Sequence, residues 1–289
     1  MNKRTLAIVS LVVVVSVWGS AVVATKSMVG TITPIVFALL RFVLASAVLL
    51  PLAIRQHRRQ PDMLRGSWGR LAVIGVLGVT VFYTLSNVAL GYASATQGIL
   101  VQSSIPVVTA GLAFALLGER LRPRQIGGIG LSLLGVLAVV LTSRPGAEAR
   151  DPLLGCLLMF GAVVAWAAYT IAAKRLNQLD QLVVTAYSTA IGTLALLPLA
   201  AFEQWGRPLP ALGGDAWLVL LYLSLASTAL GHLFYNRSLR ELEAGQAASY
   251  LNLMPVVGVA VAVLALGEPL VGWQLAGGAV VLAGVWLTS

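Results

Sequence analysis

Ten long apolar segments, separated by short clusters of arginine, proline and glycine, set the strongest limit on how this 289-residue chain can fold. Hydrophobic residues make up 58% of the chain and charged residues only 10%, whereas a soluble domain carries about 25% charged residues. A membrane-spanning helix needs about 20 mainly apolar residues, so ten such helices leave no room for a separate soluble domain. The sequence therefore predicts an all-α, polytopic membrane protein with ten transmembrane helices. The segments cover residues 5–25, 34–54, 71–91, 95–117, 125–142, 153–173, 182–201, 216–235, 244–266 and 271–288.

Basic residues are distributed unevenly between the connections, and this asymmetry predicts the orientation. With the N-terminus in the cytoplasm, fourteen lysines and arginines fall on the cytoplasmic side and four, Lys26, Arg144, Arg150 and Arg207, on the other. Short cytoplasmic loops are enriched in these residues, so we expect both termini in the cytoplasm and the chain in a bacterial inner (plasma) membrane. The formal charge of +9 then reflects topology and not a nucleic-acid partner, because the basic residues do not gather on a folded domain.

The second half of the sequence repeats the first. Shifting the chain on itself places Asn87 on Asn236, and the same shift places Pro106 on Pro255. Each copy holds five segments, an odd number, so the second copy must enter the membrane from the opposite side. We therefore expect two inverted five-helix repeats, the first over residues 1–146 and the second over residues 147–289.

Inverted repeats are the architecture of secondary transporters, in which the substrate binds near the midplane between the two copies. The alternatives are a passive channel, a duplicated membrane scaffold or, less favoured, a membrane-embedded enzyme. The chain lacks a phosphate-binding loop, and its ten acidic residues are scattered, so we expect no catalytic activity, no cofactor and no metal site. The expected partners are a small-molecule substrate and membrane lipid, for a monomer or a homodimer; whether transport is proton-coupled or facilitated stays open.

Five stretches carry a family resemblance. They are Trp18-Gly-Ser with the later Lys26, Leu40-Arg41-Phe42, Pro106 with Leu117-Gly-Glu-Arg-Leu121, Asn236-Arg-Ser-Leu239, and Pro255 with Leu266-Gly-Glu-Pro-Leu270. The chain resembles the drug/metabolite transporter superfamily and, more narrowly, its ten-helix EamA-type exporters. The resemblance implies efflux of small metabolites by alternating access, with amino-acid exporters of the YddG kind among the nearest in character.

Two polar stripes mark the expected substrate path. In the eighth segment Thr228, His232 and Tyr235 share one helix face, and Asn236 lies beside them. The third segment carries Tyr83 and Asn87 at the positions that the repeat places on His232 and Asn236. Because polar groups facing lipid are costly, both stripes are expected to face inward. The two asparagines either contact a ligand or join helices by hydrogen bonds.

Aromatic residues and prolines complete the candidate site. Trp18 and Trp166 occur deep in their segments, and Tyr169 follows one turn after Trp166, so they form either an aromatic wall for the substrate or internal packing. Mid-helix prolines at positions 106 and 255 predict kinks that act in gating or are simply fixed bends. Polar side chains near these kinks are further candidates for substrate binding, namely Gln97, Gln102, Ser103 and Ser104 in one copy and Gln246, Ser249, Tyr250 and Asn252 in the other.

Arg41 lies about seven residues inside the second segment, where a charge is expensive. It either reaches toward the membrane surface and bonds carbonyl groups or serves as a countercharge for a substrate carboxylate. Gly128 with Gly135, and Gly277 with Gly284, are each seven residues apart on one helix face. Such small-residue faces allow close helix packing first and a dimer interface second.

Overall fold

The computed structural model describes residues 3–118, 122–142, 150–208, 211–244, 247, 250–267 and 272–288. Helices fill most of these ranges, and no β-strand occurs within them. The helices are α1 (Lys3–Lys26), α2 (Pro34–His57), η1 (Pro61–Leu64), α3 (Trp68–Gly75), η2 (Val76–Val81), α4 (Phe82–Tyr92), α5 (Ala95–Gln102), α6 (Ile105–Leu117), α7 (Pro123–Thr142), α8 (Pro152–Lys174), α9 (Gln181–Gln204), α10 (Gly214–Tyr222), η3 (Leu223–Leu230), α11 (Gly231–Glu241), η4 (Tyr250–Asn252), α13 (Leu253–Leu266) and α14 (Gly272–Thr288).

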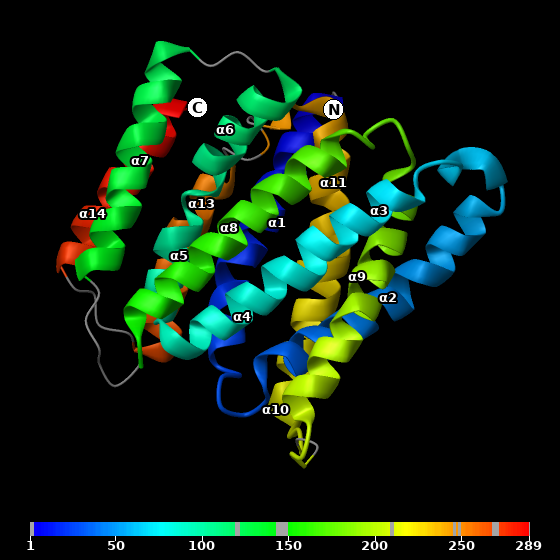
Figure 1. Ribbon diagram of the computed structural model, residues 1–289, viewed down its shortest axis with the longest axis horizontal. Helices are drawn as coiled ribbons and strands as arrows, with labels where there is room; N and C mark the ends of the chain where they lie inside the picture. Colours follow the sequence, from blue (N-terminus) through cyan, green and yellow to red (C-terminus); the bar gives the residue numbers. More distant parts are fainter. Residues whose placement is uncertain are drawn as a thin grey trace.

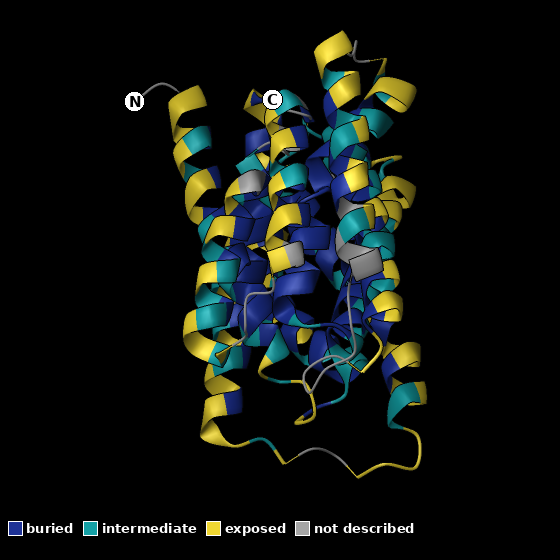
Figure 2. Cartoon of the chain, turned by 90° about the vertical axis from the view of Figure 1, so that its left-hand side faces the viewer, coloured by how far each residue is buried: buried dark blue, intermediate teal, exposed yellow. Residues whose placement is uncertain are grey.

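The expected all-α membrane fold is confirmed. Helices occupy the described part of each of the ten apolar segments, and seven continuous helical stretches are long and apolar enough to cross a bilayer. Buried residues fill the centre of the bundle and exposed ones its outer face (Figure 2), where large apolar side chains such as Leu194, Leu218 and Leu264 are more than half exposed. An apolar exterior of this kind suits contact with lipid chains.

The third and eighth segments each contain a π-helical stretch, and the two stretches are related by the repeat. In the first copy η2 joins α3 to α4, and in the second copy η3 joins α10 to α11. A π-helical turn inserts one extra residue per turn and is found mostly at functional sites. The side chains that follow each stretch therefore point in directions that a regular helix would not give them.

The prolines at the fourth and ninth segments do not kink continuous helices, which corrects the sequence-based expectation. Residues 103 and 104 form a turn between α5 and α6, and Pro106 lies in the first turn of α6. Pro255 lies in the first turn of α13, directly after the short η4. The first turn is where proline costs least, because its missing N–H would have no helical acceptor there. Each proline thus starts a second half-helix.

The start of α1 and the end of α14 lie at the same end of the bundle, called the terminal end below (Figures 1 and 2). From there α1 runs to the opposite end, whereas α8, its counterpart in the second copy, runs toward the terminal end (Figure 1). This antiparallel course agrees with inverted copies. The boundary predicted after residue 146 stays a prediction, because it falls outside the described residues, as do Arg144, Glu119 and Glu268.

The two glycine faces of the sequence meet each other. Helices α7 and α14, one from each copy, pack side by side at one edge of the bundle (Figure 1). A side chain on Gly135 would meet the backbone of Val281 and Gly277, and one on Gly284 would meet Gly128 and Ser132. The small-residue stripes therefore serve packing within one chain.

Two lysines at equivalent places cap helix ends. The Nζ atom of Lys26, at the end of α1, donates to the carbonyl oxygens of Leu90 and Ala93, each at 2.9 Å, at the end of α4. Lys174, at the end of α8, donates in the same way to Leu239 and Leu242 at the end of α11. A cation at a helix C-terminus is favoured by the helix dipole and satisfies carbonyls that have no helical donor.

Replacing Lys174 by methionine should lower the free energy of unfolding by about 1–3 kcal/mol, the range for hydrogen bonds to a charged group. Methionine keeps the length of the side chain but removes the donors. Thermal unfolding in detergent measures the effect, and Arg237→Met, which removes an exposed charge from α11, is the matched control. Equal melting temperatures for Lys174→Met and the parent protein would show that the cap contributes nothing.

Candidate functional site

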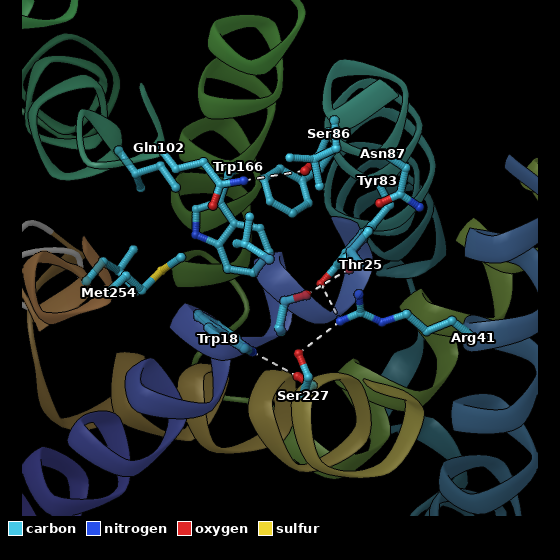
Figure 3. Close-up of a pocket in the computed structure, with 16 residues that line it drawn as sticks. Trp18, Thr25, Arg41, Tyr83, Ser86, Asn87, Gln102, Trp166, Ser227 and Met254 are labelled. Carbon is cyan, nitrogen blue, oxygen red and sulfur yellow. Dashed lines mark hydrogen bonds between the residues drawn. The ribbon is translucent and has the colours of Figure 1, made fainter. Parts of the chain in front are cut away.

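A small cavity lined by buried side chains lies at the centre of the bundle, between helices of both copies (Figure 3). Its volume is about 50 Å³, which holds only a few water molecules at the 10–15 Å³ that each requires. Side chains from α1, α2, α4 and α5 in the first copy and from α8, η3 and α13 in the second converge on it. The labelled ones in Figure 3 are Trp18, Thr25, Arg41, Tyr83, Ser86, Asn87, Gln102, Trp166, Ser227 and Met254.

Arg41 points into this cavity and does not reach toward the membrane surface (Figure 3). Its Nε donates to Thr228 Oγ1 at 2.6 Å, and its Nη2 donates to Ser227 Oγ at 2.9 Å and to the Tyr83 hydroxyl at 3.4 Å. The guanidinium carbon lies 4.6 Å from the centre of the Tyr83 ring, a cation–π distance. The structure thus replaces the carbonyl partners that the sequence suggested with hydroxyl groups, two from the second copy and that of Tyr83 from the first.

The aromatic residues form one cluster beside the cavity. The Trp166 ring lies edge-on to Trp18 at 5.1 Å between centres and also contacts Phe82 and Tyr169, both at 4.9 Å. Trp18 is fixed further by a hydrogen bond of 2.8 Å from its indole Nε1 to the carbonyl oxygen of Ser227. Both tryptophans therefore line the cavity and also pack internally, and binding of a substrate by this aromatic wall stays a prediction.

The two polar stripes meet at a single hydrogen bond. The Tyr83 hydroxyl lies 3.2 Å from His232 Nε2, and these residues occupy equivalent positions in the two copies. His232 is buried, and its ring lies within about 6 Å of the rings of Trp18 and Trp166. The predicted inward orientation of both stripes is confirmed.

A closed polar layer separates the cavity from the terminal end. The Tyr169 hydroxyl donates to Asn236 Oδ1 at 2.8 Å, and Asn236 Nδ2 donates to Thr185 Oγ1 at 3.0 Å. Beside them the hydroxyls of Thr170 and Tyr235 are 3.0 Å apart. All five side chains are buried. Asn236 therefore joins helices by hydrogen bonds in this conformation.

A second cavity lies toward the opposite end. Its volume is about 890 Å³, and it is lined by Pro34, Val88, Arg150, Glu203 and Arg207, among others. Pro34 also accepts a hydrogen bond of 3.1 Å from the side chain of Asn87, which lines the central cavity. The contact between Asn87 and Pro34 thus joins the linings of the two cavities.

The remaining candidates differ in their placement. Gln102 lines the cavity and donates to Ser86 Oγ at 3.4 Å. Tyr250 is half-buried away from the cavity lining, and the two prolines do not line it either. The side chain of Asn252 lies outside the described part of the chain, as do Gln246 and Ser249. Within the described residues no group of three histidine, cysteine, aspartate or glutamate side chains is arranged to hold a metal ion.

Sequence reasoning missed several lining residues. Thr25 lies seven residues after Trp18 on the same face of α1, and Ser86 lies three residues after Tyr83 on α4. Extending the face of α1 by two turns and that of α4 by one turn would have identified both. Ser227 could not be found in this way, because its position beside Arg41 depends on the π-helical stretch η3.

A central cavity that is lined by both copies of an inverted membrane bundle is typical of a membrane transport protein. The chain belongs to the EamA-like transporter family, whose model matches residues 5–141 and again residues 153–289. Each half of the chain is therefore one copy of the family's domain.

Individual relatives cover nearly the whole chain. A Bacillus subtilis protein, the uncharacterized transporter YyaM, is 29% identical over 268 residues, which are 91% of this chain and 87% of the relative. A probable amino-acid metabolite efflux pump of Salmonella typhimurium is 28% identical and covers 95% of this chain and 91% of its own length. A probable terminal-alkyne amino-acid exporter of Streptantibioticus cattleyicolor is 27% identical, with 99% and 94% coverage.

A solved crystal structure, titled only as that of a protein, shares the fold. It superposes with a TM-score of 0.69 at 21% identity, and the match covers 99% of this chain and 96% of the other. At this identity the comparison supports the fold alone.

Proposed function

We propose that this EamA-family protein exports amino acids or similar small metabolites across the bacterial inner membrane by alternating access, with both termini in the cytoplasm. The observation that carries the proposal is the central cavity, which side chains of both copies line. Two relatives with names that specify amino-acid efflux support the cargo class. The excess of basic residues in connections at the terminal end supports the orientation.

The cargo would bind between the aromatic cluster and the polar groups of the cavity. Trp18, Trp166 and Tyr83 supply apolar faces, and Asn87 and Gln102 supply amide groups that can donate and accept. Arg41 would pair with a carboxylate. Because the cavity has room for only a few water molecules, cargo can enter only if the two copies move apart. Transport by alternating access requires such a movement of one copy against the other.

Two sets of hydrogen bonds predict how the cycle would run. The hydrogen bond of Asn87 with Pro34 would break to release cargo toward the opposite end. The polar layer around Asn236 would break to admit cargo from the terminal end. The half-helices that Pro106 and Pro255 begin lie next to residues Gln102 and Met254, so their tilting would change the shape of the cavity wall.

A passive channel is the second candidate, and flux measurements separate the two. We expect the purified full-length protein in liposomes to take up at least one labelled compound from a panel of amino acids and their N-acetyl derivatives with saturable kinetics, and to show faster labelled uptake when the same compound is inside. Protein-free liposomes are the control. Flux that rises linearly with concentration, without counterflow, would identify a pore and overturn the proposal.

A further inference from the structure

Arg41 is a buried charge without a charged partner. It is 3% exposed and is the one lysine or arginine that is buried among those whose exposure the structure describes. In the same part of the chain no aspartate or glutamate is buried. The hydrogen bonds of Arg41 all go to neutral hydroxyl groups. The membrane-embedded site therefore carries a net charge of about plus one when no cargo is bound, and such a charge is costly to keep in a membrane.

Hydrogen bonds hold the guanidinium group in place, but some of its N–H donors have no acceptor among the residues that the structure describes. Arginine has five N–H donors. Three of them are used, one on Nε and two on Nη2, and the Tyr83 ring covers one face of the group. The Nη1 amino group makes no hydrogen bond to any residue that the structure describes, and Arg41 lines the cavity. Two donors on Nη1 are thus left for a ligand, and a carboxylate oxygen can accept a charge-assisted hydrogen bond from one of them.

Among the residues that the structure describes, the cavity offers no charged partner for an ammonium group. Besides Arg41, its polar lining includes the neutral side chains of Thr25, Ser86, Asn87, Gln102 and Ser227. An ammonium group in this small space would be repelled by Arg41 and would lose its hydration without gaining a carboxylate partner. Aromatic faces can bind cations, but the face of Tyr83 is already taken by Arg41, and the other aromatic rings of the lining, those of Trp18, Phe82 and Trp166, pack against one another.

We propose that the site carries its cargo as a monoanion, a carboxylate on an uncharged and largely apolar body, and that each transport cycle moves one net negative charge. The inference rests on the proposed function and narrows its cargo to those amino-acid derivatives and related metabolites that lack a free ammonium group. The loaded site is neutral and the empty site carries plus one. Export of the loaded, neutral site moves no net charge, and return of the empty site moves one positive charge inward, the direction that an inside-negative membrane potential favours.

This charge balance makes the membrane potential itself the driving force. A potential of 100 mV corresponds to roughly a fifty-fold gradient of a monovalent anion at equilibrium. No proton or sodium ion has to be exchanged for the cargo. A zwitterion, by contrast, would move no net charge with the substrate, and its distribution would not respond to the potential.

Three probes that differ mainly in charge test the proposal in proteoliposomes. They are N-acetyl-L-phenylalanine, a monoanion; L-phenylalanine, a zwitterion; and N-acetyl-L-phenylalaninamide, which is neutral. With valinomycin and a potassium gradient that makes the interior 100 mV positive, we expect saturable uptake of the monoanion and its accumulation toward fifty-fold. Equilibrium accumulation does not depend on the orientation of the protein in the vesicle, and protein-free liposomes correct for leakage.

The outcomes separate this inference from the proposed function. Saturable exchange of L-phenylalanine without uptake of the acetylated anion would overturn the monoanion proposal and leave the proposed function standing. Uptake of the anion that does not depend on the membrane potential would also overturn the monoanion proposal and leave the proposed function standing. An absence of saturable flux for all three probes would count against the proposed function and the inference together.

Variants at Arg41 supply the second test. Arg41→Gln keeps a polar side chain but removes the charge, so uptake of the monoanion should fall at least tenfold while the neutral amide is still carried. Arg41→Lys restores the charge and should recover potential-dependent uptake in part. Arg70→Gln, which removes an exposed arginine of α3, should behave like the parent protein. Unchanged monoanion uptake in a folded Arg41→Gln protein would overturn the proposal.

Discussion

Replacing Gly284 by alanine should separate α7 from α14 and destabilise the protein by about 3 kcal/mol, at the upper end of the range for inserting a methyl group into a packed interface. An added Cβ would lie 2.4 Å from the backbone nitrogen of Ser132 and 2.6 Å from the carbonyl oxygen of Gly128. Backbone atoms of a helix cannot move aside as the end of a flexible side chain can. Helix pairs in lipid also depend on close packing, because they lack a hydrophobic driving force between them.

A glycine elsewhere in the same pair provides the matched control. A Cβ on Gly130 of α7 would meet no other group within 4 Å. Gly130→Ala should therefore be neutral or slightly stabilising, because alanine is the better helix former by about 1 kcal/mol. Thermal unfolding in detergent compares the two variants. If both melt at the same temperature as the parent protein, the close contact between α7 and α14 does not support the fold.

This helix pair shows what the sequence could predict and what it could not. The spacing of Gly128 to Gly135, and of Gly277 to Gly284, predicted small-residue faces, because glycines seven apart lie on one side of a helix. It could not predict that the two faces would meet each other within one chain. Which helix packs against which is decided by the whole arrangement, and a local spacing carries no information about it.

The same limit applies to the candidate site. Periodicity placed Thr228, His232 and Tyr235 on one inward face, and the repeat paired Tyr83 with His232, because both rules need only local geometry and symmetry. The breaks before Pro106 and Pro255 and the π-helical stretches η2 and η3 change the local geometry itself. The contact between Ser227 and Arg41 could therefore not be predicted from the sequence. For the same reason Tyr250, which was expected to bind substrate, lies away from the cavity lining.

Replacing Trp166 by alanine should produce the largest loss of transport among single changes in the aromatic cluster. The indole ring of Trp166 contacts the rings of Trp18, Phe82, Tyr169, His232 and Tyr235, with centres 4.9 to 5.6 Å apart. It stands at the wall of the central cavity (Figure 3). Removing a buried tryptophan costs about 3–5 kcal/mol. We expect the ratio kcat/KM for a transported substrate to fall at least tenfold and the melting temperature to fall as well.

The variant Trp166→Phe separates loss of packing from loss of a binding surface. Phenylalanine keeps an aromatic ring in the cluster, so the melting temperature should stay near that of the parent protein, while the smaller face leaves part of the cargo uncovered. A raised KM with a nearly unchanged maximal rate would then assign Trp166 to the cargo-binding wall. This pattern arises when the cargo complex and the transition state of transport lose the same contact. If a folded Trp166→Phe protein instead kept its KM and Trp166→Ala lost only stability, Trp166 would be a packing residue, and the cargo would have to bind among the polar groups of α2 and α4.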